Sequence, residues 1–252
     1  MILSAPELSA QQLFSRALPQ LMNSQQIQAI FDRIAPVYDQ INNWLSLGQH
    51  RIWKQMTVKW SGAAPGDVCL DLCCGSGDLA ILLAGQAGAK GHVFGADFSP
   101  TMLAVARQRH HPKLHPCAPI SWVEADALNL PFPDSHFDAC TMGYGLRNVT
   151  DIPRCLQELR RVLKPAAKAA ILDFHRPSNP NLRAFQQWYL NSLVVPAAKH
   201  YGLTEEYAYI SPSLDRFPIG PEQVELAQKA GFASATHYPI VGGMMGVLVV
   251  TK

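Results

Sequence analysis

A glycine loop and the aspartates around it are the residues of this sequence best suited to chemistry. The loop lies in V-C-L-D-L-C-C-G-S-G-D-L-A at 68–80, where an apolar strand runs through Gly75 and Gly77 into a helix. Its letters satisfy G-x-G-x-x-G/A, and Asp97 follows at the spacing of about 20 residues expected of an acid that binds ribose hydroxyls. Taken alone, this match predicts a dinucleotide only weakly.

The charges beside the loop argue against a pyrophosphate. Asp78 places a carboxylate at the helix N-terminus, where phosphates need free N–H groups and the positive end of the helix dipole. Asp71, at the carboxyl end of the strand, adds a second negative group, which favours a ligand that carries an ammonium. S-adenosylmethionine has an amine and a sulfonium but no phosphate, so it is the favoured cofactor.

One acid also stands at the end of each of the next two strands. Asp97 is placed to accept hydrogen bonds from both ribose hydroxyls, and Asp126 to accept one from the adenine amine, with Ala127 beside it. For any single acid, a turn or a helix cap is the simpler interpretation. Their occurrence together at successive strand ends favours a cofactor site.

Short apolar runs separated by helix-length segments predict the elements that position these acids. Ser99-Pro100 and Asp151 mark helix starts, and Lys164-Pro165 marks a helix end. The alternation predicts an α/β fold with a doubly wound, mostly parallel sheet. The strand candidates lie at 68–72, 92–97, 120–125, 137–142, 169–174, 235–240 and 247–250.

Helices flank this alternation. Apolar spacing predicts an N-terminal helical layer, or lid, over 24–61, and further helices are expected in an insertion before the last two strands, at 180–194, 204–214 and 221–230. Residues 1–23 show only a weak amphipathic pattern, which leaves a tail or an interfacial helix open. We expect 24–252 to form a single domain.

Composition narrows the class of protein. Of 252 residues, 48% are apolar and 16% charged, and the formal charge of +2 provides no field that would attract nucleic acid. No run is long enough to span a membrane, so we expect a cytoplasmic protein, with membrane-surface contact and homo-oligomer formation left open. The six cysteines lack metal-ligand spacing, and we expect no metal.

From about Gln28 onward the sequence resembles the ubiquinone/menaquinone-biosynthesis C-methyltransferases, which are class I S-adenosylmethionine-dependent enzymes with a Rossmann-like sheet. It departs from their usual L-K-P-G-G at Ala166 and Ala167, where we expect a reshaped turn away from the cofactor, and it has His175 where they usually have another residue. The stretches that carry the resemblance are F-D-R-I-A-P-V-Y-D-Q-I-N-N-W-L-S-L-G-Q-H-R-I-W-K at 31–54, D-L-C-C-G-S-G-D at 71–78, A-D-F-S-P-T-M-L at 96–103, A-D-A-L-N-L-P-F-P-D-S-H-F-D at 125–138, G-Y-G-L-R-N-V-T-D at 143–151 and R-V-L-K-P at 161–165.

The resemblance implies methyl transfer to a ring carbon of a reduced, demethylated naphthoquinone, with demethylphylloquinol becoming phylloquinol. Methylation of a demethylmenaquinol or of a benzoquinol is the alternative, and an NAD-dependent oxidoreductase is the alternative from another class. Such a lipophilic quinol substrate would also account for the low charge. The other product is S-adenosylhomocysteine.

The resemblance also implies roles for particular residues. Arg147 would stabilise a phenolate electrostatically, because arginine stays protonated, and Asn148 would orient the hydroxyl or a water. Asp39 is the expected proton acceptor. The expected cofactor contacts are Tyr38, Asp71, Gly75, Ser76, Gly77, Asp97, Phe98, Asp126, Ala127 and Gly143.

Overall fold

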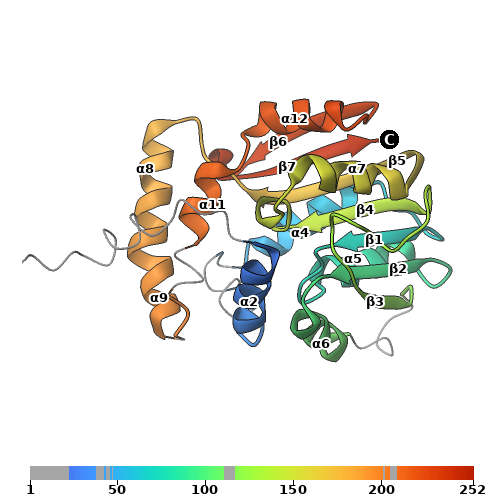
Figure 1. Cartoon of the computed structure of the whole chain (residues 1–252), viewed down its shortest axis with the longest axis horizontal. Coiled ribbons are helices and arrows are strands. Elements are labelled where there is room, and N and C mark those ends of the chain that lie inside the picture. Colours follow the sequence, from blue (N-terminus) through green and yellow to red (C-terminus); the bar gives the residue numbers. More distant parts are fainter. Residues whose placement is uncertain are drawn as a thin grey trace, which may run out of the picture.

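A seven-stranded sheet forms the centre of the protein (Figure 1). The computed structural model describes residues 23–37, 43, 46, 48–110, 117–200, 202–204 and 209–252. The strand order is β3-β2-β1-β4-β5-β7-β6, and only β7 runs against its neighbours, so the predicted mostly parallel sheet is confirmed. The strands are β1 (Val68–Leu72), β2 (His92–Asp97), β3 (Ile120–Glu124), β4 (Phe137–Gly143), β5 (Leu163–Phe174), β6 (Ser234–Ile240) and β7 (Met245–Thr251).

Helices cover both faces of the sheet because its strands are apolar on both sides. On one face, Leu70 and Leu72 pack in a cluster with residues of α7 (Ile152–Val162) and α12 (Gly220–Lys229). On the other, Cys69 packs with α5 (Asp78–Ala87) and with Val58 of α4 (His50–Trp60). Because side chains alternate along a strand, Asp71 shares the α4 and α5 face with Cys69.

The two predicted helix starts are confirmed by their caps. The Ser99 hydroxyl accepts a hydrogen bond from the backbone of Met102 at 3.0 Å, with Pro100 as the first residue of α6 (Pro100–Arg109). Asp151 accepts from the backbone N–H of Arg154 at 2.9 Å and starts α7. Both caps satisfy amide groups that a helix leaves without partners.

The fifth strand begins earlier than its apolar run predicts. Helix α7 ends at Val162, and β5 starts at Leu163, with a register shift against β4 before the regular pairing from Lys168 onward. Pro165 lies within this irregular start. The sequence pattern identifies only the regular part, because Lys164, Pro165 and Lys168 interrupt the apolar run at its start.

The first helical segment of the insertion begins at Pro180, as predicted, but extends beyond the predicted end at 194. Helix α8 (Pro180–Tyr189) continues through a π-helical turn, η2 (Leu190–Val194), into α9 (Val195–His200), and it stands at one end of the molecule (Figure 1). The expected helix at 204–214 is described from α11 (Ile210–Arg216) onward.

The N-terminal layer contains α2 (Ser24–Ile34) and α4. Helix α2 is fastened to the end of β2: the Ser99 hydroxyl donates to Asp32 Oδ1 at 2.5 Å, and Gln28 Nε2 donates to the carbonyl of Phe98 at 2.8 Å. Residues 1–22 lie outside the described residues. Among the helices that the structure describes, none is long and apolar enough to cross a membrane.

Candidate functional site

An open cavity of about 930 Å³ lies at the carboxyl ends of β1, β2 and β4. The strand order reverses between β1 and β4, and ligands of open α/β sheets bind beside such a switch point. Nine residues predicted from the sequence line this cavity: Asp71, Gly75, Ser76, Asp97, Phe98, Asp126, Ala127, Gly143 and Asn148. Gly77 and Arg147 are not part of this wall, while Tyr38 and Asp39 lie outside the described residues.

Asp71 has one carboxylate oxygen without a protein partner. Its side chain is fully buried, and Oδ1 accepts a hydrogen bond from the Thr141 hydroxyl at 2.7 Å, whereas Oδ2 has none. Burial raises the pKa of Asp71 to about 7, against the lowering effects of the Thr141 hydroxyl and the backbone amide of Ala80. A buried acceptor without a partner is costly, so this oxygen is suited to a donor that arrives with a ligand.

The glycine loop turns sharply between β1 and α5. Gly77 caps α5 with a φ of +87°, and a Cβ there would lie 2.6 Å from the Trp122 ring. The backbone N–H of Gly75 donates to Asp97 Oδ2 at 2.8 Å. Gly77 therefore has a structural task, the tight turn, which lets its neighbours Gly75 and Ser76 form the wall.

Asp97 joins two loops as well as lining the cavity. Its Oδ1 accepts from the backbone N–H of Ser99 at 2.9 Å, and its Oδ2 holds Gly75. Burial raises the pKa of Asp97 to about 6. A carboxylate offers about four lone-pair positions, so both oxygens retain acceptor capacity for ribose hydroxyls.

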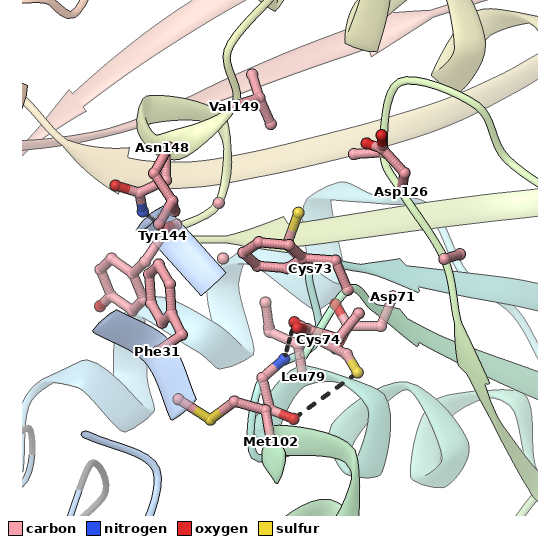
Figure 2. A pocket seen from close by; sticks show the side chains of 18 of the residues that line it. Phe31, Asp71, Cys73, Cys74, Leu79, Met102, Asp126, Tyr144, Asn148 and Val149 are labelled. Carbon is pink, nitrogen blue, oxygen red and sulfur yellow. Dashed lines mark hydrogen bonds between the residues drawn. The ribbon is translucent and has the colours of Figure 1, made fainter. Parts of the chain in front are cut away.

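One carboxylate oxygen of Asp126 stabilises a turn, which is the simpler role considered for an acid at a strand end. Its Oδ1 accepts from the backbone N–H of Leu128 at 2.9 Å, which closes a turn after β3. The residue is exposed and also lines the cavity (Figure 2). Asp126 therefore both stabilises a turn and lines the cavity.

Contrary to the sequence-based expectation, Asp78 does not make the N-terminus of α5 repel an anion, because two cations pair with it. Its carboxylate lies 2.5 Å from Lys54 Nζ and 2.6 Å from Arg109 Nη2. Although burial raises the pKa of Asp78, Lys54 and Arg109 lower it to about 2. The three groups together carry one positive charge, so this end of α5 is not electronegative. Neither cation was predicted, because both are far from Asp78 in the sequence.

The turn after β4 presents a second acceptor without a protein partner. Tyr144 has a φ of +60°, which is rare for a residue other than glycine, and its carbonyl accepts from Asn148 Nδ2 at 2.8 Å. Asn148 Oδ1 is buried without a partner. Figure 2 shows Tyr144, Asn148 and Phe31 of α2 on one side of the cavity, across from Asp126.

Arg147 is held by partners within the protein and does not line the cavity. Its guanidinium pairs with Asp173 Oδ1, Nε donates to the Ser213 hydroxyl at 3.0 Å, and the group lies 5.3 Å from the centre of the Phe174 ring. Both partners of the ion pair are buried. Direct stabilisation of a phenolate by Arg147 therefore finds no support in this arrangement.

His175 is a hydrogen-bonded core residue, as is usual for a lone histidine at a strand end. Its Nδ1 lies 3.0 Å from the carbonyl of Asp173, and its Nε2 lies 2.7 Å from Gln223 and 2.9 Å from His237. Burial lowers the pKa of His175. These contacts tie β5 to α12 and β6.

The six cysteines are free, and four are buried. No group of metal-binding side chains occurs within the ranges that the structure describes. Phe185 and Trp188 of α8 are exposed.

Solved structures with this architecture include S-adenosylmethionine-dependent methyltransferases. A protein from Thermotoga maritima, a possible histamine N-methyltransferase, matches with a TM-score of 0.61 at 20% identity over 89% of this chain and 99% of its own. A further S-adenosylmethionine-dependent methyltransferase, from Aquifex aeolicus, matches with a TM-score of 0.60 at 19% identity, over 84% of this chain and 97% of its own. These similarities establish the fold class.

The sequence comparisons establish the family. The model of the ubiE/COQ5 methyltransferase family matches residues 20–252, and the chain belongs to this family. A relative from Trichormus variabilis, named 2-phytyl-1,4-naphtoquinone methyltransferase, is 70% identical over 90% of this chain and 99% of its own. The Arabidopsis thaliana 2-phytyl-1,4-beta-naphthoquinone methyltransferase is 52% identical over 91% of this chain and 88% of its own. The chain is thus a methyltransferase, and the oxidoreductase alternative is set aside.

Proposed function

We propose that this enzyme transfers a methyl group from S-adenosylmethionine to a ring carbon of a reduced 2-phytyl-1,4-naphthoquinone, giving phylloquinol. The names and identities of its relatives support the substrate. The observation that carries the proposal is the pair of buried acceptors without protein partners in one cavity wall, Asp71 Oδ2 and Asn148 Oδ1. One suits a ligand ammonium and the other a ligand hydroxyl.

The residues on the donor side fit S-adenosylmethionine. Asp71 Oδ2 would accept from its ammonium, Asp97 from the ribose and Asp126 from the adenine amine. At Gly75 a Cβ would meet nothing within 4 Å, so this part of the wall leaves room for a close approach. When bound, this donor supplies a methyl group already activated by sulfonium. The protein's task is then to align the acceptor carbon and exclude water.

The residues on the acceptor side fit a flat quinol. Asn148 Oδ1 would accept the hydrogen bond of a ring hydroxyl and hold it for deprotonation, because a phenol has a pKa of about 10 and its phenolate is the stronger carbon nucleophile. Phe31 and Tyr144 offer aromatic surfaces beside it. Arg147 acts in this proposal as a positioning residue that fixes the turn bearing Asn148, and Asp39 remains the proposed proton acceptor.

The outer side of α8 and η2 supports contact with a membrane that holds the lipid substrate. Three large apolar side chains on it are exposed: Phe185 by 48%, Trp188 by 54% and Leu193 by 41%. The sequence from 174 to 204 contains no acidic residue. Arg183 of α8 and Lys199 of α9 are exposed, and Arg183 lies 3.9 Å from Asp215 of α11. Aromatic and basic side chains together suit an anionic lipid surface.

The test is methyl transfer from labelled S-adenosylmethionine. Demethylated 2-phytyl-naphthoquinone and the corresponding benzoquinone are each offered reduced with dithionite and oxidised. We expect product only from the reduced naphthoquinol. Methylation of the benzoquinol alone would overturn the ring assignment, and methylation of the oxidised quinone would overturn the phenolate mechanism. Binding of the donor without methylation of either ring would overturn the proposed substrate.

A further inference from the structure

Lys54 is the one cation among the described residues that line the cavity. The same wall contains four carboxylates, those of Asp71, Asp78, Asp97 and Asp126. Lys54 is only 5% exposed, on the inner side of α4. Burying an ammonium is costly unless it has partners, so a lysine in this position requires an explanation.

The contacts of Lys54 fix the position of its ammonium and leave donors for a ligand. Nζ donates to Asp78 Oδ2 at 2.5 Å and lies 5.7 Å from the centre of the Tyr144 ring. An ammonium has three donors, and Asp78 accepts one of them. Asp78 also pairs with Arg109, so its single negative charge is shared between two cations.

Lys54 also lies on the same side of the sheet as Asp71. Helices α4 and α5 cover the face toward which Asp71 points, and the charge of Lys54 lowers the pKa of Asp71 within the balance set by burial. The wall thus places an ammonium within electrostatic range of a carboxylate whose Oδ2 has no partner. An α-amino acid carries the complementary pair of charges on one carbon.

We propose that Lys54 binds the carboxylate of the methionyl group of S-adenosylmethionine, with Asp71 binding its ammonium and Asp78 positioning Lys54. This inference rests on the proposed use of that donor. It assigns a carboxylate-binding residue to the N-terminal helical layer, so that α4 contributes to donor recognition as well as to packing.

The experiment compares two ligands by calorimetry on the whole protein. One is S-adenosylhomocysteine; the other is its decarboxylated analogue, which lacks only the carboxylate. We expect Lys54→Gln to weaken binding of S-adenosylhomocysteine by about 10- to 100-fold, as for loss of a charged hydrogen bond, and to change binding of the analogue by less than about threefold. Lys59→Gln, an exposed lysine on the same helix, should change neither.

Two outcomes overturn the inference: equal weakening of both ligands by Lys54→Gln, which would mean a general role in shaping the loop, or no weakening of either. If Lys54→Gln fails to fold, the Lys54→Met/Asp78→Asn double variant removes both charges of the pair, and the ratio of the two dissociation constants gives the same test. Wild-type protein that binds S-adenosylhomocysteine but methylates no quinol would overturn only the proposed substrate.

Discussion

Individual polar atoms show most directly how this site is built. Asp71 and Asn148, which both line the cavity, each use one polar atom of the side chain within the protein, through Thr141 and the Tyr144 carbonyl, and each keep one oxygen without a partner. Each internal hydrogen bond fixes the direction of the free oxygen before a ligand arrives. Such pre-organisation reduces the cost of binding and alignment.

Asn148→Ala should reduce turnover while leaving donor binding intact. The variant removes the proposed acceptor of the quinol hydroxyl, so we expect a loss in kcat/KM of about 10- to 100-fold. S-adenosylhomocysteine affinity, measured by calorimetry, should stay within about twofold of wild type. A parallel loss of that affinity would place Asn148 on the donor side instead.

Arg147→Ala should act first on stability. It leaves the buried Asp173 carboxylate without its cation, and breaking a buried ion pair in this way costs about 3–5 kcal/mol. Urea unfolding followed by circular dichroism measures this cost, and the Arg147→Met/Asp173→Asn variant should recover much of it. Turnover that stays abolished in a stable double variant would contradict a purely positioning role.

Binding of S-adenosylhomocysteine should strengthen as pH rises through neutrality. Asp71 has a pKa raised to about 7 and must be ionised to bind an ammonium, so we expect affinity to be about fourfold higher at pH 8.5 than at pH 6.5. The unligated protein should show the opposite trend in stability, which falls as pH rises from about 4 to 7, because only the unfolded chain's Asp71 ionises there. Calorimetry at constant ionic strength tests the first expectation, and a flat or weaker profile in Asp71→Asn is the control.

The sequence predicted the acidic residues of the site better than the basic ones. Asp71 and Asp97 lie near the carboxyl ends of apolar strands and Asp126 comes shortly after one, so their location at one edge of the sheet is visible from local pattern. Lys54 and Arg147 depend on partners brought close by folding, Asp78 and Asp173, which no local pattern identifies. Nothing in a helical run such as R-I-W-K indicates that its lysine is buried.

At the scale of elements, strands and caps were predicted to within a few residues because apolar runs and cap residues are local signals. The start of β5 was not. Ala166 lies there with a φ of +63°, in the left-handed region that favours glycine, and its N–H donates to the Lys252 carbonyl at 3.1 Å. The family's usual glycine is thus replaced while the backbone conformation that suits glycine is retained.

Ala166→Gly should therefore stabilise the protein. The left-handed conformation costs an alanine about 1–2 kcal/mol, which exceeds the entropy that glycine loses on folding, so we expect a gain of about 1 kcal/mol. The residue is exposed and its hydrogen bond uses only backbone atoms, so packing is unaffected. Urea denaturation measures the gain; Ala167→Gly, buried and without a positive φ, should destabilise instead.

At the scale of the whole molecule, α8 stands at one end of the fold (Figure 1). The side chains of Phe185 and Trp188 on this helix are exposed. The Phe185 and Trp188 rings lie 5.9 Å apart, so they form one continuous apolar surface. Sequence periodicity could not reveal this, because the same spacing also predicts core aromatics. Only the completed fold shows that no described element covers them.

Replacing Phe185 and Trp188 together with serine should weaken binding to vesicles that contain anionic lipid by about tenfold or more, since each ring contributes about 1.5–3 kcal/mol when buried. Co-sedimentation measures this binding, and S-adenosylhomocysteine affinity should not change. Ile52→Ser, an exposed apolar residue on α4, is the matched control. An equal loss from Ile52→Ser would show that α8 has no special part.

Asp97 and Ser99 form a junction where three parts of the chain meet. The carboxylate holds the glycine loop and the start of α6, while the Ser99 hydroxyl caps α6 and donates to Asp32 of α2. Opening any one of these segments breaks a hydrogen bond that also holds a neighbouring segment in place. The loop, α6 and α2 are therefore expected to open as one cooperative unit in hydrogen exchange. A molecule that stabilises the loop is expected to slow the opening of α2 as well.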